Sequence, residues 1–299
     1  MSIYLEVINC DLCGKDDFKP LFNESTFTFG QCRNCSLYYI RSRPTEESQA
    51  KIVKNAPLKR SQSSMKGEFL ESSLFREQEC LEYLETVEKF LRKGRLLDVG
   101  CGIGTLMWFA KKRKWEVEGV ELNKHKLEIA LSMNIGEVYS SPVEELNLPK
   151  ASYDIVTMIN VFSHLRSPKK TFRHLMSLIK PKGFLLIRTG EIRRNPTKHD
   201  LPPSGLGIPH HLVWNSAKTF GLYAKAIHAD IVYHKSIPFN EYFVRNKFKY
   251  KSKKYYKQCA KIILRNIPGF IDLVVNWDNW KNRNNPFYDA MIIYKERSL

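Results

Sequence analysis

Apolar positions in the middle of the chain recur at regular periods. Between residues 68 and 93 they mostly follow one another at steps of three and four, which predicts an amphipathic helix ending near Gly94. The positions of this apolar stripe are Leu70, Leu74, Leu81, Leu84, Val87, Phe90 and Leu91. The apolar run 96–99 predicts a strand, 105–110 a helix, and 115–121 a second strand. A further helix is predicted at 217–228, with Ser216 as its cap, and a final strand at 289–294.

Other segments are polar or interrupted. Residues 41–67 are rich in Ser and Lys and contain Pro44 and Pro57, which indicates a linker or a lid. No apolar run reaches 18 residues, so no transmembrane helix is expected. Residues 1–9 lack the basic and apolar regions of an export signal. We therefore expect a cytoplasmic protein.

Charge narrows the choice of partners. The 299 residues include 48 Lys and Arg against 31 Asp and Glu, a formal net charge of +17, and 43% are hydrophobic. This composition excludes a disordered polycation and an ordinary acidic enzyme, and favours nucleic acid, an anionic membrane surface or a phosphorylated small molecule as partner. Residues 241–265 hold nine basic residues and one acid, interleaved with aromatics. Two interpretations stand: a solvated face, or contact of 241–275 with a membrane, which would place the protein at the inner membrane face.

Four of the seven cysteines form two C-x2-C pairs. Cys10 and Cys13 make the first pair, and Cys32 and Cys35 follow after an 18-residue gap. Two such pairs supply four thiolates to one tetrahedral zinc ion, with no position left for water, so this zinc would be structural. The alternative is four unconnected thiols or a redox pair.

A glycine-rich loop follows the strand 96–99. Gly100, Gly102 and Gly104 are followed by a helix and then by a strand that ends on Glu121, 21 residues after Gly100. In this layout the loop approaches a nucleotide-type ligand and the acid accepts hydrogen bonds from ribose hydroxyls. The G-x-G-x-G spacing differs from the G-x-G-x-x-G of pyrophosphate-binding dehydrogenases, which favours a ligand without a pyrophosphate.

These residues resemble the class I S-adenosylmethionine-dependent methyltransferases. Residues 98–104 match the family's first motif, and 148–156, 160–168 and 178–187 are similar to its later motifs. The resemblance implies an α/β fold: a Rossmann-like seven-stranded sheet with helices on both faces, preceded here by the small zinc ribbon. It divides the chain into a ribbon at 1–43, a linker and helix at 44–93, a cofactor-binding core at 94–190, and a substrate-side segment at 191–299.

The resemblance also implies cofactor contacts. The residues that would bind S-adenosylmethionine are Asp98, Gly100, Cys101, Gly102, Gly104, Glu121, Val143 and Asn160. Among them, Asp98 would brace the loop and the amino end of the cofactor. Where the family often has an adenine-binding acid, this chain has Pro142; Glu144 is two positions out of register.

Three histidines are candidate bases. Residues 208–216 resemble a segment of methyltransferases that carry an N-terminal four-cysteine zinc domain and act on nucleotide-linked sugars. Methylating a hydroxyl, or a carbon beside a carbonyl, requires removal of a proton, and histidine suits this task. Within this segment His211 is the first candidate and His210 the second. His164, in the segment 160–168, is a further candidate for a base or a substrate contact. For each, a purely structural role is the alternative.

The function expected from these features is methyl transfer to a carbohydrate intermediate, either a nucleotide-linked or a lipid-linked sugar, by O- or C-methylation. The substrate would be an anionic small molecule or glycan. An RNA methyltransferase is the first alternative, because zinc modules and basic-aromatic surfaces suit phosphate contact and base stacking. A non-catalytic membrane-surface or nucleic-acid-binding protein with this fold is the second.

Overall fold

The computed structural model describes residues 3–56, 65–201, 205–238 and 287–297. The basic stretch 241–265 and its continuation to 275, for which a membrane or anionic partner is predicted, lie outside these residues. None of the helices in the described part of the chain has both the length and the apolar character needed to cross a bilayer.

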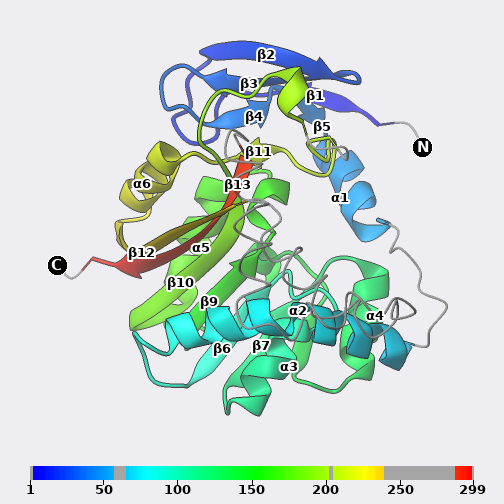
Figure 1. Ribbon diagram of the computed structural model, residues 1–299, viewed down its shortest axis with the longest axis vertical. Coiled ribbons are helices and arrows are strands. Elements are labelled where there is room, and N and C mark those ends of the chain that lie inside the picture. The colour runs from blue at the N-terminus through cyan, green and yellow to red at the C-terminus, as the bar shows by residue number, and fades with distance from the viewer. Residues whose placement is uncertain (1–2, 57–64, 202–204, 239–286, 298–299) are drawn as a thin grey trace, which may run out of the picture.

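A seven-stranded sheet forms the centre of the molecule (Figure 1). All neighbouring strands are parallel except β13, which runs antiparallel to both its neighbours. The order across the sheet is β8 (Glu137–Tyr139), β7 (Glu116–Val120), β6 (Arg95–Val99), β9 (Tyr153–Ile159), β10 (Ile179–Ile192), β13 (Phe287–Glu296) and β12 (Ala229–Pro238). The α/β class and the predicted final strand are confirmed.

Helices cover both faces of this sheet, and the alternation of side chains along each strand explains why. Leu96, Ile155 and Leu186 share one hydrophobic cluster with helices α2 (Met65–Val87), α3 (Thr105–Lys112) and α4 (Lys124–Ser132). Their sequence neighbours Leu97 and Val156 point the other way, into a cluster with α5 (Pro168–Leu178) and α6 (Ala217–Ala226). Both clusters are buried, so each face needs its layer of helices.

The predicted helix at 68–93 is present as α2, which ends at Val87, and Leu84 and Val87 of the predicted stripe are buried. The first half of the stripe is not. Leu70 and Leu74 are 44% and 56% exposed, whereas Phe69 and Tyr83 are almost completely buried. The ring of Phe69 packs edge-on against Trp108 of α3. Packing against α3 therefore decides which face of α2 is buried, and the leucine period alone does not.

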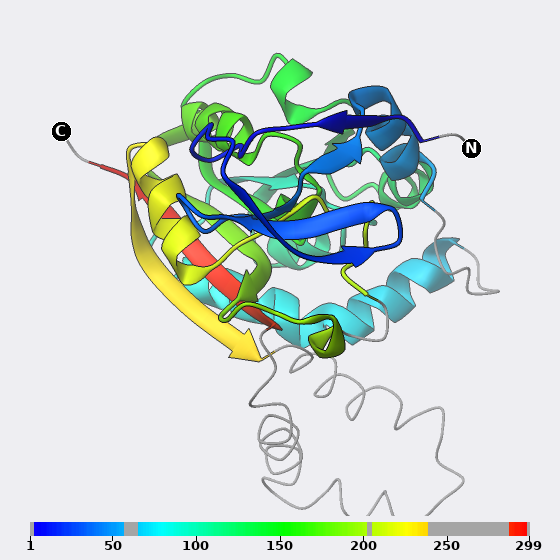
Figure 2. The same cartoon turned by 90° about the horizontal axis from the view of Figure 1, so that it is seen from above.

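The N-terminal segment forms two small sheets at one end of the central sheet (Figure 1). Strands β2 (Phe18–Glu24), β3 (Phe27–Cys32) and β4 (Tyr38–Ile40) form a sheet in which β4 also pairs with β11 (Val213–Trp214), a short strand about 170 residues further along the chain. Strands β1 (Leu5–Val7) and β5 (Ser42–Pro44) pair with each other and lead into helix α1 (Glu46–Lys54). Figure 2 shows these blue strands lying above the rest of the molecule.

The four-stranded N-terminal sheet shares the hydrophobic cluster of α5 and α6. Phe29 contacts Trp214 of β11 edge-on, with ring centroids 5.1 Å apart. The first cysteine pair also touches α5: the Asp11 carboxylate accepts a hydrogen bond from the Lys169 amide at 3.1 Å, in the first turn of that helix. A carboxylate at a helix N-terminus satisfies an otherwise unpaired N–H group and interacts favourably with the helix dipole.

Candidate functional site

A cavity of about 400 Å³ lies at the carboxyl ends of β6, β7 and β9. In parallel α/β sheets this edge is where ligands bind. Seven of the eight predicted cofactor-binding residues line the cavity: Asp98, Gly100, Cys101, Gly102, Glu121, Val143 and Asn160. The eighth, Gly104, caps the start of α3 in a left-handed conformation with φ of 85°.

The glycine-rich loop is shaped for a close ligand. Gly100 has φ of 74°, and a Cβ built there would lie 2.2 Å from Val161, so a larger residue is excluded. Glu121 follows β7 and is buried; its carboxylate accepts hydrogen bonds from the Gly102 amide at 2.8 Å and the Asn123 amide at 2.7 Å. This carboxylate therefore sits on the cavity wall beside the loop, where the resemblance places ribose hydroxyls.

Asp98 and Arg76 bring opposite charges to the floor of the cavity. Asp98 accepts a hydrogen bond from Thr157 at 2.7 Å, and burial raises its pKa to about 6 although Thr157 and Arg76 act in the other direction. Arg76 lies in α2 and pairs with Glu79 at 3.1 Å. A guanidinium has five donors, so Arg76 keeps capacity to bind a carboxylate such as that of a methionine moiety. Arg76 was missed by the sequence argument, because only the docking of α2 brings it to the cavity.

We expect the affinity for S-adenosylmethionine to depend on Asp98 ionisation. The cofactor carries positive charge, so it binds better when Asp98 is ionised, and with a pKa of about 6 that carboxyl is mostly protonated at pH 5. Lowering the pH from 7 to 5 should weaken binding roughly tenfold. Titration calorimetry at pH 5, 6 and 7 measures this. The Asp98→Asn variant should bind more weakly and without this pH dependence; a wild-type Kd that stays constant over the range would contradict the assignment.

The adenine end differs from the register counted on the sequence. Residues 143–145 form a 3-10 helix, and this tight turn brings Val143 and Glu144 together into the cavity wall. Thr171 of α5 donates a hydrogen bond to one oxygen of Glu144. Glu144, set aside on the sequence as out of register, therefore lies in the wall beside Val143, and Pro142 lines the same region.

Helix α1 contributes a further wall of the cavity, from inside the polar segment 41–67. Val53 and Ala56 line the cavity, and the carbonyl oxygens of both accept hydrogen bonds from Asn123 Nδ2 at 3.1 and 3.0 Å. Asn123 also caps α4, where its Oδ1 accepts from the Lys126 amide. One side chain therefore ties α1 to the strand end that carries Glu121.

The three candidate histidines lie close together but differ in their access to the cavity. His164 and His210 line it, and the ring of His211 packs against that of His164 with centroids 4.6 Å apart. The backbone carbonyl of His210 accepts a hydrogen bond from Nδ1 of His164 at 2.8 Å. Because a carbonyl only accepts, Nδ1 must carry the proton, and Nε2 of neutral His164 has a free lone pair. Burial, and then His211, lower the pKa of His164 to about 4, while burial lowers that of His211.

The four paired cysteines converge as the sequence predicts. Their sulfur atoms all lie within 4.8 Å of one another, with Cys10 and Cys35 3.4 Å apart and Cys13 and Cys32 3.6 Å apart. A tetrahedral zinc ion with bonds of about 2.3 Å requires sulfur–sulfur separations of about 3.8 Å. The cluster therefore fits zinc, and these four residues would hold it.

Comparison with known proteins agrees with this geometry. A family model described as a methyltransferase domain matches residues 73–258. The ubiquinone biosynthesis O-methyltransferase of Bordetella avium is 34% identical over 122 residues, 39% of this chain and 50% of that protein. The protein of the same name from Acinetobacter baylyi is 34% identical over 113 residues, 35% of this chain and 46% of that protein. The chain thus spans about half the length of these curated relatives.

Solved structures show the same fold. Haemonchus contortus phosphoethanolamine N-methyltransferase 2, in complex with S-adenosyl-L-methionine, superposes with a TM-score of 0.58 at 14% identity, covering 93% of this chain and 71% of that one. A putative sarcosine dimethylglycine methyltransferase from Galdieria sulphuraria gives 0.52 at 17% identity, over 74% and 85%. The family model covers more than half of the chain. The chain therefore belongs to the methyltransferase-domain family.

Proposed function

We propose that the enzyme methylates a hydroxyl group and that His164 removes the hydroxyl proton. The observation that carries the proposal is the hydrogen bond from His164 Nδ1 to the His210 carbonyl, which leaves Nε2 unprotonated on a residue that lines the cavity. Since the pKa of His164 is about 4, the ring is neutral at pH 7 and its Nε2 carries a lone pair. His211, the first candidate on the sequence, packs behind this ring and is not among the residues that line the cavity.

The chemistry divides between cofactor and protein. S-adenosylmethionine, when bound, would supply an electrophilic methyl group and would be converted to S-adenosylhomocysteine. His164 takes the proton that the hydroxyl loses, and the apolar neighbours Val161 and Leu165 exclude water from the same wall. Glu121, Arg76 and Asp98 bind and orient the cofactor.

A carbohydrate intermediate, either nucleotide-linked or lipid-linked, is the acceptor that we favour. Two features resemble sugar methyltransferases: the four-cysteine module and the segment 208–216. These features adjoin, because β11 pairs with β4 and the Ile40 amide donates to the Leu212 carbonyl at 3.1 Å. The histidine segment and the cysteine module thus form one structural unit beside the cavity, which supports a shared role in acceptor binding.

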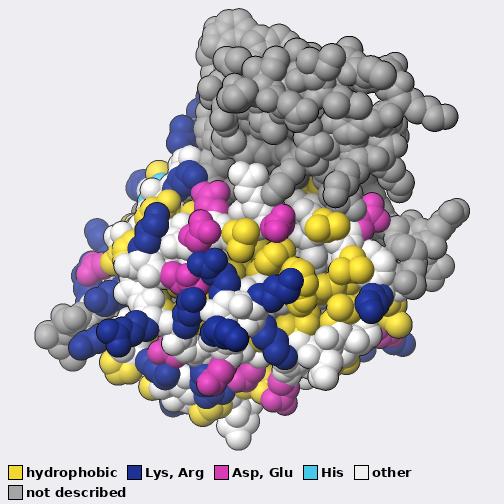
Figure 3. Space-filling model, turned by 60° about the horizontal axis from the view of Figure 1, so that its bottom comes forward, with side chains coloured by type: hydrophobic (Ala, Val, Ile, Leu, Met, Phe, Trp, Pro, Cys, Tyr) yellow, Lys and Arg dark blue, Asp and Glu magenta, His cyan; other side chains and the backbone are white. Residues whose placement is uncertain are grey.

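A ubiquinone precursor is the second candidate acceptor. The curated relatives are named for ubiquinone biosynthesis, and they too are O-methyltransferases. Their similarity spans 39% or less of this chain, so most of the remaining chain, where acceptor specificity can reside, differs from them. RNA is the third candidate acceptor. On the face shown in Figure 3, basic and acidic side chains are interspersed, and the basic stretch 241–265 lies outside the described residues.

An acceptor panel tests the proposal directly. Purified enzyme is incubated with methyl-labelled S-adenosylmethionine and, separately, nucleotide-linked sugars, lipid-linked sugars, a polyprenyl phenol precursor of ubiquinone, and RNA. We expect label on an oxygen of a sugar conjugate. Label on the phenol would instead identify the ubiquinone precursor as the acceptor. Label on RNA that decreases steeply as the salt concentration increases would overturn both candidates.

A further inference from the structure

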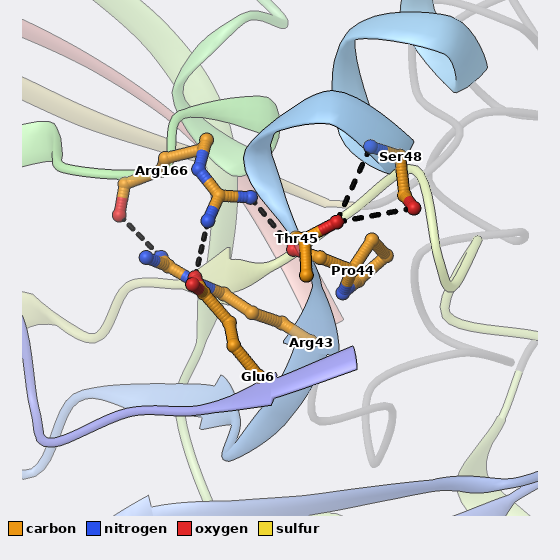
Figure 4. A network of polar contacts seen from close by, with 6 residues as sticks. All are labelled: Glu6, Arg43, Pro44, Thr45, Ser48 and Arg166. Carbon is orange, nitrogen blue, oxygen red and sulfur yellow. Dashed lines mark hydrogen bonds and ion pairs between the residues drawn. The ribbon is translucent and has the colours of Figure 1, made fainter. Parts of the chain in front are cut away.

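A polar network joins the N-terminal strands to the loop that carries His164 (Figure 4). Arg166 lies two residues after His164, and both its ends are held: its carbonyl accepts from Arg43 Nη1 at 2.5 Å, and its Nη1 donates to the Pro44 carbonyl at 2.7 Å. The Glu6 carboxylate accepts from both guanidinium groups. The loop after β9 is thereby fixed to β1 and β5 by backbone and side chain together.

The same strands position helix α1, which forms part of the cavity wall. Pro44, whose carbonyl is bound by Arg166, immediately precedes Thr45, the N-cap of α1. Thr45 Oγ1 accepts from the Ser48 amide, and the Tyr4 amide donates to Ser48 Oγ at 3.1 Å. Arg166 therefore connects two walls of one cavity: the loop with His164, and α1 with Val53 and Ala56.

The stability of this network depends on each of its charged members. Glu6 is the carboxylate between two guanidinium groups, and the side chains of Arg43 and Arg166 are only 11% and 20% exposed. Burial and the neighbouring Arg43 lower the pKa of Arg166, although Glu6 acts against both. Removing Glu6 or Arg166 leaves the remaining partly buried charges imperfectly paired, which is costly.

The loop that carries His164, residues 163–169, makes further hydrogen bonds at both of its ends. The Leu212 amide donates to the Ser163 carbonyl at 2.7 Å, and the Asp11 carboxylate accepts from the Lys169 amide. Residues 163, 166 and 169 are thus each held by hydrogen bonds whose partners belong to the N-terminal module or to the segment paired with it.

We propose that Arg166 is a positioning residue, through which the N-terminal strands hold His164 at the orientation needed for proton removal. This inference rests on the proposed role of His164. Arg166 does not line the cavity, so its effect passes through the loop: without its fork of hydrogen bonds the loop shifts, and the hydrogen bond from His164 Nδ1 to the His210 carbonyl is lost. Lys cannot make both contacts of the planar guanidinium.

Nitrogen-15 NMR of labelled histidine tests this without an acceptor, because it reports which ring nitrogen carries the proton. In wild type with S-adenosylmethionine, His164 should show a protonated Nδ1, with the signal assigned by its absence in His164→Asn. In Arg166→Gln we expect that signal to change to a mixture of tautomers, and in Arg166→Lys to be partly retained. Glu6→Gln should act in the same direction. With the acceptor methylated in the panel, kcat should fall roughly 10- to 100-fold and the Kd for S-adenosylmethionine should change less than about threefold.

Arg41→Gln is the matched control, since Arg41 pairs with Asp16 on the exposed ribbon surface at 2.7 Å. It should leave the His164 signal and kcat unchanged. A folded Arg166→Gln protein with the wild-type tautomer overturns the inference, and so does equal loss of cofactor affinity and kcat. Full activity of His164→Asn would instead overturn the proposed base, while the NMR result would still report whether Arg166 orients the ring.

Discussion

Replacing His164 by asparagine should lower kcat by about 10²- to 10⁴-fold, the range expected when a general base is removed. Asparagine keeps a hydrogen-bond donor for the His210 carbonyl but has no basic nitrogen. The Kd for S-adenosylmethionine should stay within about threefold of wild type, because the loss falls on the transition state and not on cofactor binding. Steady-state kinetics with calorimetry of cofactor binding measures both quantities.

His211→Asn is the matched control for this substitution. If His211 were the base, as its place in the segment 208–216 first suggests, kcat would fall further in His211→Asn than in His164→Asn. The pH profile gives a second check: activity follows the neutral fraction of His164, so kcat should fall only as the pH drops toward about 4. An acid limb of kcat at a pH well above 4 that disappears in His211→Asn would reverse the assignment.

The cofactor half of the site could be predicted from sequence because its signals are local. Gly100 and Gly102 stand in a short stretch between a strand and a helix, and Glu121 ends the next strand. Strand periodicity places these residues at one sheet edge whatever the rest of the chain does. The cysteine cluster was predictable for the same reason, since each C-x2-C pair turns tightly by itself.

The remainder of the site depends on contacts between distant segments. Arg76 belongs to a helix whose buried face is decided by α3, and the leucine stripe placed Leu70 and Leu74 on the wrong side. Helix α1 lies in a polar segment and becomes a cavity wall through Asn123. Pairing of β11 with β4 joins residues about 170 positions apart. No local pattern encodes such contacts, because each is selected by the packing of the whole fold.

Removing metal from the cysteine cluster should unfold the N-terminal sheet and loosen the histidine segment with it. A module this small has little core of its own, and structural zinc in comparable sites contributes about 10 kcal/mol or more to folding. Protein as purified should contain close to one zinc per chain by mass spectrometry of the metal. A chelator, or Cys35→Ser, should then increase amide exchange in 27–40 and 206–216.

Amide exchange in different parts of the chain distinguishes local loosening from unfolding of the whole protein. Strands β6 and β9 lie in the buried centre of the main sheet, so their exchange should change little when the metal is removed. The histidine segment should respond, because Val213 and Trp214 pair with Tyr39 and Tyr38 of the ribbon. Zinc should restore protection and magnesium should not, because thiolate sites favour the softer ion. Protein that contains no zinc, yet exchanges identically with and without chelator, would show that the cluster folds through its thiols alone and would leave Arg166 and Asp11 as the contacts that hold the loop.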